Sequence, residues 1–269
     1  VLSSPDVIKT LQTLPGVASG TELLSGMYVH GGTGSDNLFL LDGVPLYQVS
    51  HLAGLFSSFN TDIIDNVDFY KSGFPARYGS RMSSIVDVST KDGDMQKYHG
   101  LFSIGLLDGR LQFEGPIVKG RTSFNVAMRR SWIDVLSAPA LAIVNGTMRD
   151  KTRLHYAFGD FNAKVTHLFA PDNKLTAAFY YGKDSFNFGF DYVGQYMYGE
   201  LIPGGEDLTD SDGIELKWGN ILASLRWQNR LTDQLTSDIN AYYTKFSSGT
   251  EYHSYWWDHL GEEVFALEG

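Results

Sequence analysis

Polar and apolar residues alternate along much of the chain after residue 93 with the period of a β-strand. Between residues 221 and 230 most odd positions are apolar, including Ile221, Leu225 and Trp227, and most even positions are polar. Successive side chains of a strand point to opposite faces, so this spacing predicts strands with one apolar and one polar face. The pattern predicts seven strands, at about residues 98–107, 110–115, 122–131, 153–169, 175–188, 213–231 and 235–248.

The links between these predicted strands fall into two length classes. Those after the second, fourth and sixth strands are short, at residues 116–121, 170–174 and 232–234, whereas those after the third and fifth are long, at 132–152 and 189–212. Outer-membrane β-barrels have short turns on one side and long loops on the other. A soluble sandwich has no reason to sort its loops by length, although a soluble all-β domain stays the alternative. Because bacterial barrels have an even strand number, seven strands predict an incomplete barrel, part of a longer one.

The first 93 residues predict a small α+β unit instead. Val7, Ile8 and Leu11 have helical spacing behind Ser4-Pro5-Asp6, a candidate N-cap and first turn, and Pro15 ends that pattern. Short apolar runs then alternate with Gly-rich loops and Asp-Gly turns. The predicted strands lie at residues 27–29, 38–41 and 85–90, with a strand or a helix-to-strand step at 63–70. We therefore expect two domains, residues 1–93 and residues 94–269.

Composition and charge exclude several classes of protein. The formal net charge of −10 makes the chain a poor candidate for binding nucleic acid, which requires Lys and Arg to neutralise phosphates. The absence of cysteine excludes disulfides, cysteine-based zinc sites and thiol catalysis. The 29 glycines, 17 phenylalanines and 15 tyrosines favour strands and turns. The longest uncharged apolar stretch, residues 138–144, is far shorter than the ~20 residues of a membrane helix.

Several separated motifs resemble one known family, in that family's order. The segments Gly31 to Tyr47, Leu55 to Asn60 and Tyr70 to Lys91 are similar to the plug domain of TonB-dependent outer-membrane receptors. Phe113 to Ile117 and Arg129 to Trp132 look like the first barrel strands of the same family. The motifs cover residues 5–135, and the remainder of the chain resembles the family in pattern.

The resemblance implies a transporter in the outer membrane of a Gram-negative bacterium. Its fold would be an α+β plug domain followed by antiparallel transmembrane strands, a fragment of a barrel of about 22 strands. Such a protein binds a scarce solute, of the iron chelate, cobalamin or glycan type, and admits it to the periplasm by energy-coupled movement of the plug. The implied partners are the inner-membrane protein TonB, acting through a segment N-terminal to this chain, outer-membrane lipid, the solute and a surface lipoprotein.

The resemblance also suggests ligand and plug-to-barrel contacts. Outward-facing plug loops carry ligand contacts in the family, and these map onto Ser19, Gly20, Thr21, Ser35, Asp36, Tyr47, Gln48 and His51. Family members have an arginine where this chain has His30, between Val29 and Gly31. We expect His30 and Arg81 to contact the barrel, with a weaker or pH-sensitive tie at His30 because an unperturbed histidine is mostly neutral. A packed, hydrogen-bonded His30 is the alternative.

Motifs for catalysis or metal binding are absent from the sequence. No nucleotide-binding, zinc-protease or serine-hydrolase signature occurs, and the seven histidines show no ligand spacing. The acidic segment 189–212 lacks the ligand positions of an EF-hand, so we expect a solvated loop, with looser cation binding as the alternative. We therefore predict no enzyme, no cofactor and no metal.

The tyrosines and tryptophans near strand ends, Tyr180 included, indicate a membrane-interface girdle or, alternatively, ligand stacking.

Two other functions stay open at this level. A passive porin or an adhesin would share the strand pattern but needs no compact α+β unit. A soluble carbohydrate-binding module would account for the aromatic residues but not for the sorted loop lengths.

Overall fold

A computed structural model describes residues 6–19, 27–29, 37–71, 73–75, 78, 84–193, 196–197, 200–201, 209–257 and 263–268. The chain divides into two compact units. Unit 1 contains Val1–Arg130, Gly159–Gly182 and Gly219–Phe246, and unit 2 contains Ser131–Phe158, Lys183–Trp218 and Ser247–Gly269.

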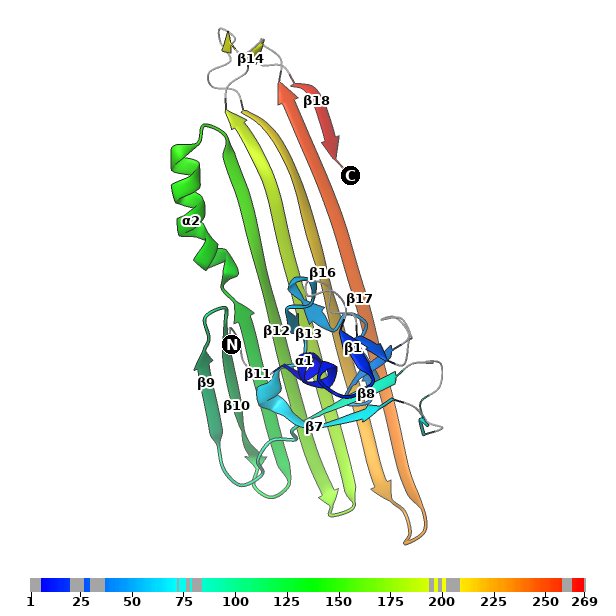
Figure 1. Cartoon of the computed structure of the whole chain (residues 1–269). Coiled ribbons are helices and arrows are strands. Elements are labelled where there is room, and N and C mark those ends of the chain that lie inside the picture. Colours follow the sequence, from blue (N-terminus) through cyan, green and yellow to red (C-terminus); the bar gives the residue numbers. More distant parts are fainter. Residues whose placement is uncertain are drawn as a thin grey trace. The chain divides into compact units, whose positions relative to one another are not determined.

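The first part of unit 1 is a mixture of short helices and strands (Figure 1). Its elements are α1 (Val7–Gln12), β1 (Val17–Ser19), β2 (Met27–Val29), β3 (Asn37–Leu41), β4 (Val44–Pro45), β5 (Ser50–His51), η2 (Leu52–Gly54), β6 (Phe56–Ser57), η3 (Thr61–Ile63), β7 (Ile64–Tyr70) and β8 (Ser84–Thr90). The predicted strands and the helix-to-strand step at 63–70 are confirmed. The predicted helix is confirmed and begins at Val7, with Asp6 as its N-cap, because the Asp6 carboxylate accepts a hydrogen bond from the backbone N–H of Lys9.

A four-stranded mixed sheet, in the order β4-β3-β8-β7, forms the centre of this part. Strands β3 and β8 pair in parallel, and both carry buried apolar residues. The apolar face of α1 packs into the same core. The core residues are Val7, Ile8, Leu11, Phe39, Leu41, Val44, Leu46, Phe59, Val86, Val88, Tyr180 and Leu222. Two of them, Tyr180 and Leu222, come from the long strands of unit 1, so these strands complete the core.

Long strands follow, which we call the wall: β9 (His99–Ile104), β10 (Asp108–Val118), β11 (Thr122–Ser131), β12 (Lys151–Ala170), β13 (Asn173–Val193), β16 (Thr209–Arg230), β17 (Thr236–Trp257) and β18 (Glu263–Glu268). Over the described part of the chain they form one open sheet of eight strands in the order β18-β17-β16-β13-β12-β11-β10-β9. The pairs β9–β10, β11–β12 and β17–β18 are antiparallel. The predicted fold class, an α+β unit followed by antiparallel strands in an incomplete sheet, is confirmed.

The structure corrects three details of the sequence interpretation. The segment 132–152 is not only a loop, because it contains helix α2 (Ile133–Thr147). The link predicted at 189–212 is shorter than expected, because β13 extends to Val193 and β16 begins at Thr209. A small hairpin of β14 (Tyr196–Met197) and β15 (Glu200–Leu201) lies between these two strands. Strand β18 was not predicted. The missed helix has Pro139 inside it and no side-chain cap, so it lacks the usual helix signals.

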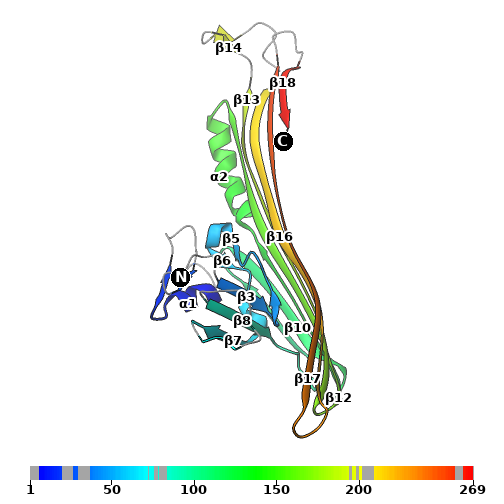
Figure 2. The same ribbon diagram turned by 90° about the vertical axis from the view of Figure 1, so that its right-hand side faces the viewer.

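The predicted two-faced strands are confirmed, and the polar face is the buried one. On β11 and β12 of unit 1, Asn125, Arg129 and Lys164 are buried. The apolar side chains of the opposite face are exposed, for example Val165 and Leu225, the latter at 50%. In Figure 2 the sheet of β3, β7 and β8 lies on one side of strands β10 and β16, the side to which these polar residues point. No helix in the described ranges is long and apolar enough to cross a membrane.

Candidate functional site

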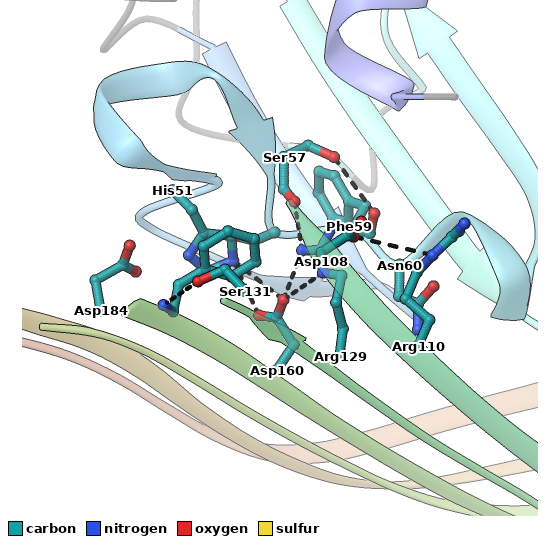
Figure 3. A network of polar contacts seen from close by, with 12 residues as sticks. His51, Ser57, Phe59, Asn60, Asp108, Arg110, Arg129, Ser131, Asp160 and Asp184 are labelled. Carbon is teal, nitrogen blue, oxygen red and sulfur yellow. Dashed lines mark hydrogen bonds and ion pairs between the residues drawn. The ribbon is translucent and has the colours of Figure 1, made fainter. Parts of the chain in front are cut away.

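A buried carboxylate, that of Asp160 on β12, lies at the centre of a network of polar contacts (Figure 3). Its side chain has no exposed surface. Oδ2 accepts hydrogen bonds from Nε and Nη2 of Arg129, at 2.8 and 2.5 Å. Oδ1 accepts one from the Tyr180 hydroxyl at 2.7 Å, and Nε2 of His51 lies 3.0 Å from the same oxygen. The network therefore saturates both carboxylate oxygens with donors.

Strand register places these groups together. Arg129 on β11 and Asp160 on β12 are direct cross-strand partners, so their side chains leave the sheet side by side on its polar face. His51 belongs to the short β5–β6 hairpin, in which it pairs with Phe56. Arg129 Nη2 also donates to the Ser57 carbonyl of this hairpin at 2.6 Å. The network thus ties segment 51–57 of the α+β unit to the wall.

A second group of contacts surrounds Lys164 on β12. Its Nζ donates to Asp42 Oδ1 at 3.0 Å and to the Thr90 carbonyl at 2.7 Å, and it lies 3.2 Å from Asp92 Oδ1. Lys174 Nζ contacts the other oxygen of Asp92 at 2.9 Å. Burial by itself raises the pKa of Asp92, but Lys164 and Lys174 outweigh it and lower that pKa. This group holds the end of β8 and the following linker against the wall.

Neutral and charged hydrogen bonds continue the contact along the other wall strands. Arg110 on β10 donates to Asp62 at 2.9 Å. Asn220 on β16 donates to the Gln48 carbonyl at 2.7 Å, and the Thr244 hydroxyl on β17 donates to the Pro45 carbonyl at 2.9 Å. The α+β unit therefore has side-chain contacts with wall strands from β10 to β17.

A cavity of about 580 Å³ interrupts this contact between the β3–β4 hairpin and strands β16 and β17. Charged and polar side chains line much of it, including Asp87, Arg226 and Asn240. Arg226 forms a two-pronged ion pair with Asp238, through Nε at 2.8 Å and Nη2 at 2.5 Å. A volume of this size is within the range of small-molecule sites.

Within the described residues, the contacts of Asp160 and Lys164 join the α+β unit to the wall. The Asp160 carboxylate already accepts from charged and neutral donors, so it has no free lone pair directed at a substrate. No group of three or more His, Asp or Glu side chains in the described ranges is placed to hold a metal ion.

The structure places only some of the residues predicted from sequence. Gly20, Thr21, His30, Ser35, Asp36 and Arg81 lie outside the described residues. Ser19 is the last residue of β1. Tyr47 is 56% exposed, Gln48 bonds to Ser50 and Asn220, and His51 is buried against Asp160. The ligand role of all these residues stays a prediction, and for His51 the contact that the structure shows is with the wall.

Sequence reasoning missed the wall side of the site, namely Arg129, Asp160, Lys164 and Tyr180. The first three had a usable signal, since each is a charged residue on the polar face of a predicted strand. The girdle interpretation of Tyr180 is wrong, because its ring is buried and its hydroxyl binds Asp160.

Comparison with known proteins gives one family and several structures. Residues 2–85 match the family model for the TonB-dependent receptor plug domain. No curated protein sequence matches the chain. Among solved structures, the siderophore receptor PirA from Acinetobacter baumannii is 13% identical with a TM-score of 0.49, over 94% of this chain and 43% of that one. The outer membrane transporter YddB from Escherichia coli is 11% identical with a TM-score of 0.48, over 98% and 50%. The chain spans about half the length of these structures or less.

Proposed function

Since residues 2–85 are a TonB-dependent receptor plug domain, we propose that the chain is the plug and the first wall strands of an outer-membrane transporter. The transporter binds a scarce extracellular solute and admits it to the periplasm by energy-coupled movement of the plug. The plug-to-wall boundary is placed at Gly93 in this proposal, as the sequence suggests. The proposed location is the outer membrane of a Gram-negative bacterium.

One observation carries the proposal. The segment that matches the plug model forms hydrogen bonds and ion pairs with the polar face of the wall, and the other face of the wall is apolar and exposed. A soluble protein buries its apolar face, whereas the strands of a membrane barrel are apolar outside and polar inside. Arg129, Asp160 and Lys164 point inward, and Val165 and Leu225 point outward. This arrangement supports a wall that faces lipid with a plug inside it.

The contacts between plug and wall also support movement of the plug. They are mainly ion pairs and hydrogen bonds, such as His51 to Asp160 and Lys164 to Asp42. Polar contacts of this kind are exchanged for contacts with water at lower cost than apolar contacts, because water also hydrogen-bonds to the freed groups. We propose that the energy-coupling protein TonB, pulling on a segment N-terminal to residue 1, releases part of this contact.

In this proposal the solute is an iron chelate, a cobalamin or a glycan. The candidate residues that contact it are Tyr47 and Gln48, together with Ser19, Gly20, Thr21, Ser35 and Asp36. Outer-membrane lipid and a surface lipoprotein are further proposed partners. No catalytic step forms part of the function.

The test uses the full-length protein in cells with and without TonB. Uptake of labelled ferric chelates, cobalamin and oligosaccharides is measured, and the expected result is accumulation of one solute that ceases when TonB is deleted. Deleting the segment upstream of the plug is expected to have the same effect. Undiminished uptake in both cases supports a passive porin instead. Normal folding of residues 94–269 in buffer without detergent contradicts the membrane location.

A further inference from the structure

The arginine that joins β10 to the plug has two acidic neighbours, one in the plug and one in the wall. Arg110 Nη1 donates to Oδ1 of Asp62, in η3 of the plug, at 2.9 Å. Its Nε lies 3.9 Å from Oδ2 of Asp108, two residues earlier on β10. Side chains two residues apart on a strand point to the same face, so Asp108 and Arg110 both point to the plug side of the wall. Only the contact with Asp62 is a hydrogen bond, because 3.9 Å is too long for one.

Three charged atoms at this point are buried and have no hydrogen-bond partner within the described residues. They are Asp62 Oδ2, Asp108 Oδ2 and Arg110 Nε. A buried polar atom without a partner destabilises the state in which it occurs, and a charged one does so more strongly. The contact between plug and wall is therefore incompletely satisfied at Arg110, whereas both oxygens of the Asp160 carboxylate have donors.

Residues of this chain already enclose the Asp108 carboxylate, so its unpaired oxygen does not depend on any strand that pairs with the free edge of β9. The residue is only 2% exposed. The turn before β10 lies directly against it, because a Cβ atom at Gly105 would come within 2.8 Å of Asp108 Oδ1. A side chain from elsewhere has no access to Oδ2 while this enclosure holds. Arg110, on the same strand, is the cation that is already close to it.

We propose that Arg110 switches its partner from Asp62 to Asp108 when the plug separates from the wall at this point. The inference rests on the proposed transport function and adds to it the residue that takes up the freed charge. While plug and wall are in contact, Asp62 holds the guanidinium and Asp108 Oδ2 has no donor. After separation, a rotation of the Arg110 side chain closes the gap of 3.9 Å, and Nε donates to Asp108 Oδ2. The wall is then left with a neutral ion pair instead of an unpaired cation.

Asp108 thereby favours the separated state over the contact state. Its Oδ2 gains a hydrogen bond from a charged donor only after separation, and in the contact state the same oxygen is buried without one. An interaction made in only one of two states shifts the equilibrium toward that state. A carboxylate that merely stabilised the fold of the wall would contribute equally to both states and would leave this equilibrium unchanged.

Amide hydrogen exchange of plug segment 60–63, measured by mass spectrometry on the full-length protein in detergent, reports how often this segment separates from the wall. Asp108→Asn is expected to slow this exchange about tenfold, because the separated state loses a hydrogen bond between charged groups. The effect is expected to vanish in an Arg110→Met background. Asp62→Asn is expected to speed the exchange, since the contact state loses its charged acceptor. Glu114→Gln is the matched control, because Glu114 lies on the same face of β10 and forms no hydrogen bond or ion pair within the described residues.

Faster or unchanged exchange in Asp108→Asn overturns the inference, as does slower exchange that persists with Arg110→Met. Asp108→Ser removes the same carboxylate and is expected to act alike, so the result does not depend on the folding of one variant. In cells with TonB, Asp108→Asn is expected to lower the uptake of labelled ferric chelates, cobalamin or oligosaccharides about tenfold, and Glu114→Gln to leave it unchanged. TonB-dependent uptake that Asp108→Asn does not lower rejects the partner switch and leaves the transport function intact. Uptake that does not depend on TonB rejects the transport function, whereas slower exchange in Asp108→Asn still supports the switch.

Discussion

At the residue scale, the Asp160 carboxylate is the group whose loss is expected to cost most. Asp160→Asn keeps the size of the side chain but leaves Arg129, which is 5% exposed, as a buried cation without its counter-ion. Removing one partner of a buried ion pair costs about 3–5 kcal/mol. We therefore expect a loss of that order in the free energy of unfolding of the full-length protein, measured by urea titration in detergent.

The ion pair of Arg226 and Asp238 provides the matched control. It has the same two-pronged geometry, but Asp238 is 45% exposed. An exposed pair contributes about 0–1 kcal/mol, since water replaces the missing partner. Asp238→Asn is expected to stay within that range. Equal losses for the two variants contradict the central role of the Asp160 network in holding the plug.

Residue positions on the strands were predictable, whereas the identity of their partners was not. Period-two alternation places Arg129, Asp160 and Lys164 on one polar face. It does not say that His51, 109 residues before Asp160, lies against that face. Such a pairing depends on how the β5–β6 hairpin folds against the wall, and no local pattern encodes it. For the same reason Tyr180 could not be distinguished from the outward tyrosines.

At the element scale, helix α2 protects part of the edge of β12. The backbone register of β11 with β12 runs from Gly159 to His167, and beyond it the Phe158 N–H donates to the Ser131 hydroxyl at 2.9 Å. In unit 2 the side chain of Asn145 on α2 bonds to the backbone of Thr152 on β12. Its Oδ1 accepts from the Thr152 N–H at 2.8 Å, and its Nδ2 donates to the Thr152 carbonyl at 2.9 Å. The amide thus reproduces one step of an antiparallel ladder.

Two neighbouring substitutions test this role of α2. Asn145→Ala removes both bonds to Thr152 and is expected to speed amide hydrogen exchange in α2 and at Thr152. Gly146→Ala has no atom within 4 Å to collide with and is expected to slow exchange in α2, since alanine stabilises a helix by about 0.5–1 kcal/mol over glycine. If Asn145→Ala leaves exchange unchanged, the helix is held by other contacts.

Two carboxylates in the linker after β8, those of Asp92 and Asp94, should make the stability of the folded protein depend on pH. The pKa of Asp92 lies below its ordinary value of 3.8, because Lys164 and Lys174 outweigh the effect of burial. The ionised Asp92 carboxylate therefore stabilises the folded state fully above the ordinary pKa, and this stabilisation is lost as the pH falls through the lowered pKa of the folded state. Asp94 behaves alike, with its pKa lowered to about 2 by the backbone N–H groups of Gln96 and Lys97.

We expect a constant unfolding midpoint from pH 5 to 7 as far as Asp92 and Asp94 determine it, and a decline below about pH 4. Thermal unfolding of the full-length protein in detergent measures this dependence. Lys174→Met, which removes one cation beside Asp92, is expected to lower the plateau and reduce the decline. Lys119→Met in the β10–β11 turn serves as the control. A steeper decline in Lys174→Met than in the parent contradicts this assignment.

Elements with a strong local signal were predicted and those without one were missed. β11 was expected at residues 122–131 and is found there, because an alternating face and short turns delimit it. Helix α2 has no polar face, no N-cap side chain and an internal proline, so neither periodicity nor caps reveal it. The hairpin β14–β15 and strand β18 follow the acidic and aromatic segments that carry no clear alternation.

At the scale of the whole molecule, the two faces of the wall make the membrane proposal open to a direct measurement. Leu225 is 50% exposed on the outward face of β16, between the outward residues Ala223 and Trp227. In water, replacing an exposed leucine changes the free energy of unfolding by about 0.5 kcal/mol or less. In the middle of a bilayer, an arginine on the lipid face of a barrel costs about 2–4 kcal/mol.

The free energy of unfolding of Leu225→Arg therefore distinguishes an outward face in water from one in a bilayer. The full-length protein is unfolded and refolded with urea in phospholipid vesicles, and Thr232→Arg, in the exposed turn between β16 and β17, is the control for an added charge outside the bilayer. We expect a loss of about 2–4 kcal/mol for Leu225→Arg and almost none for Thr232→Arg. Near-zero changes for both would mean that the outward face of the wall meets water, and then the buried polar face has to be explained by a partner protein instead of a membrane.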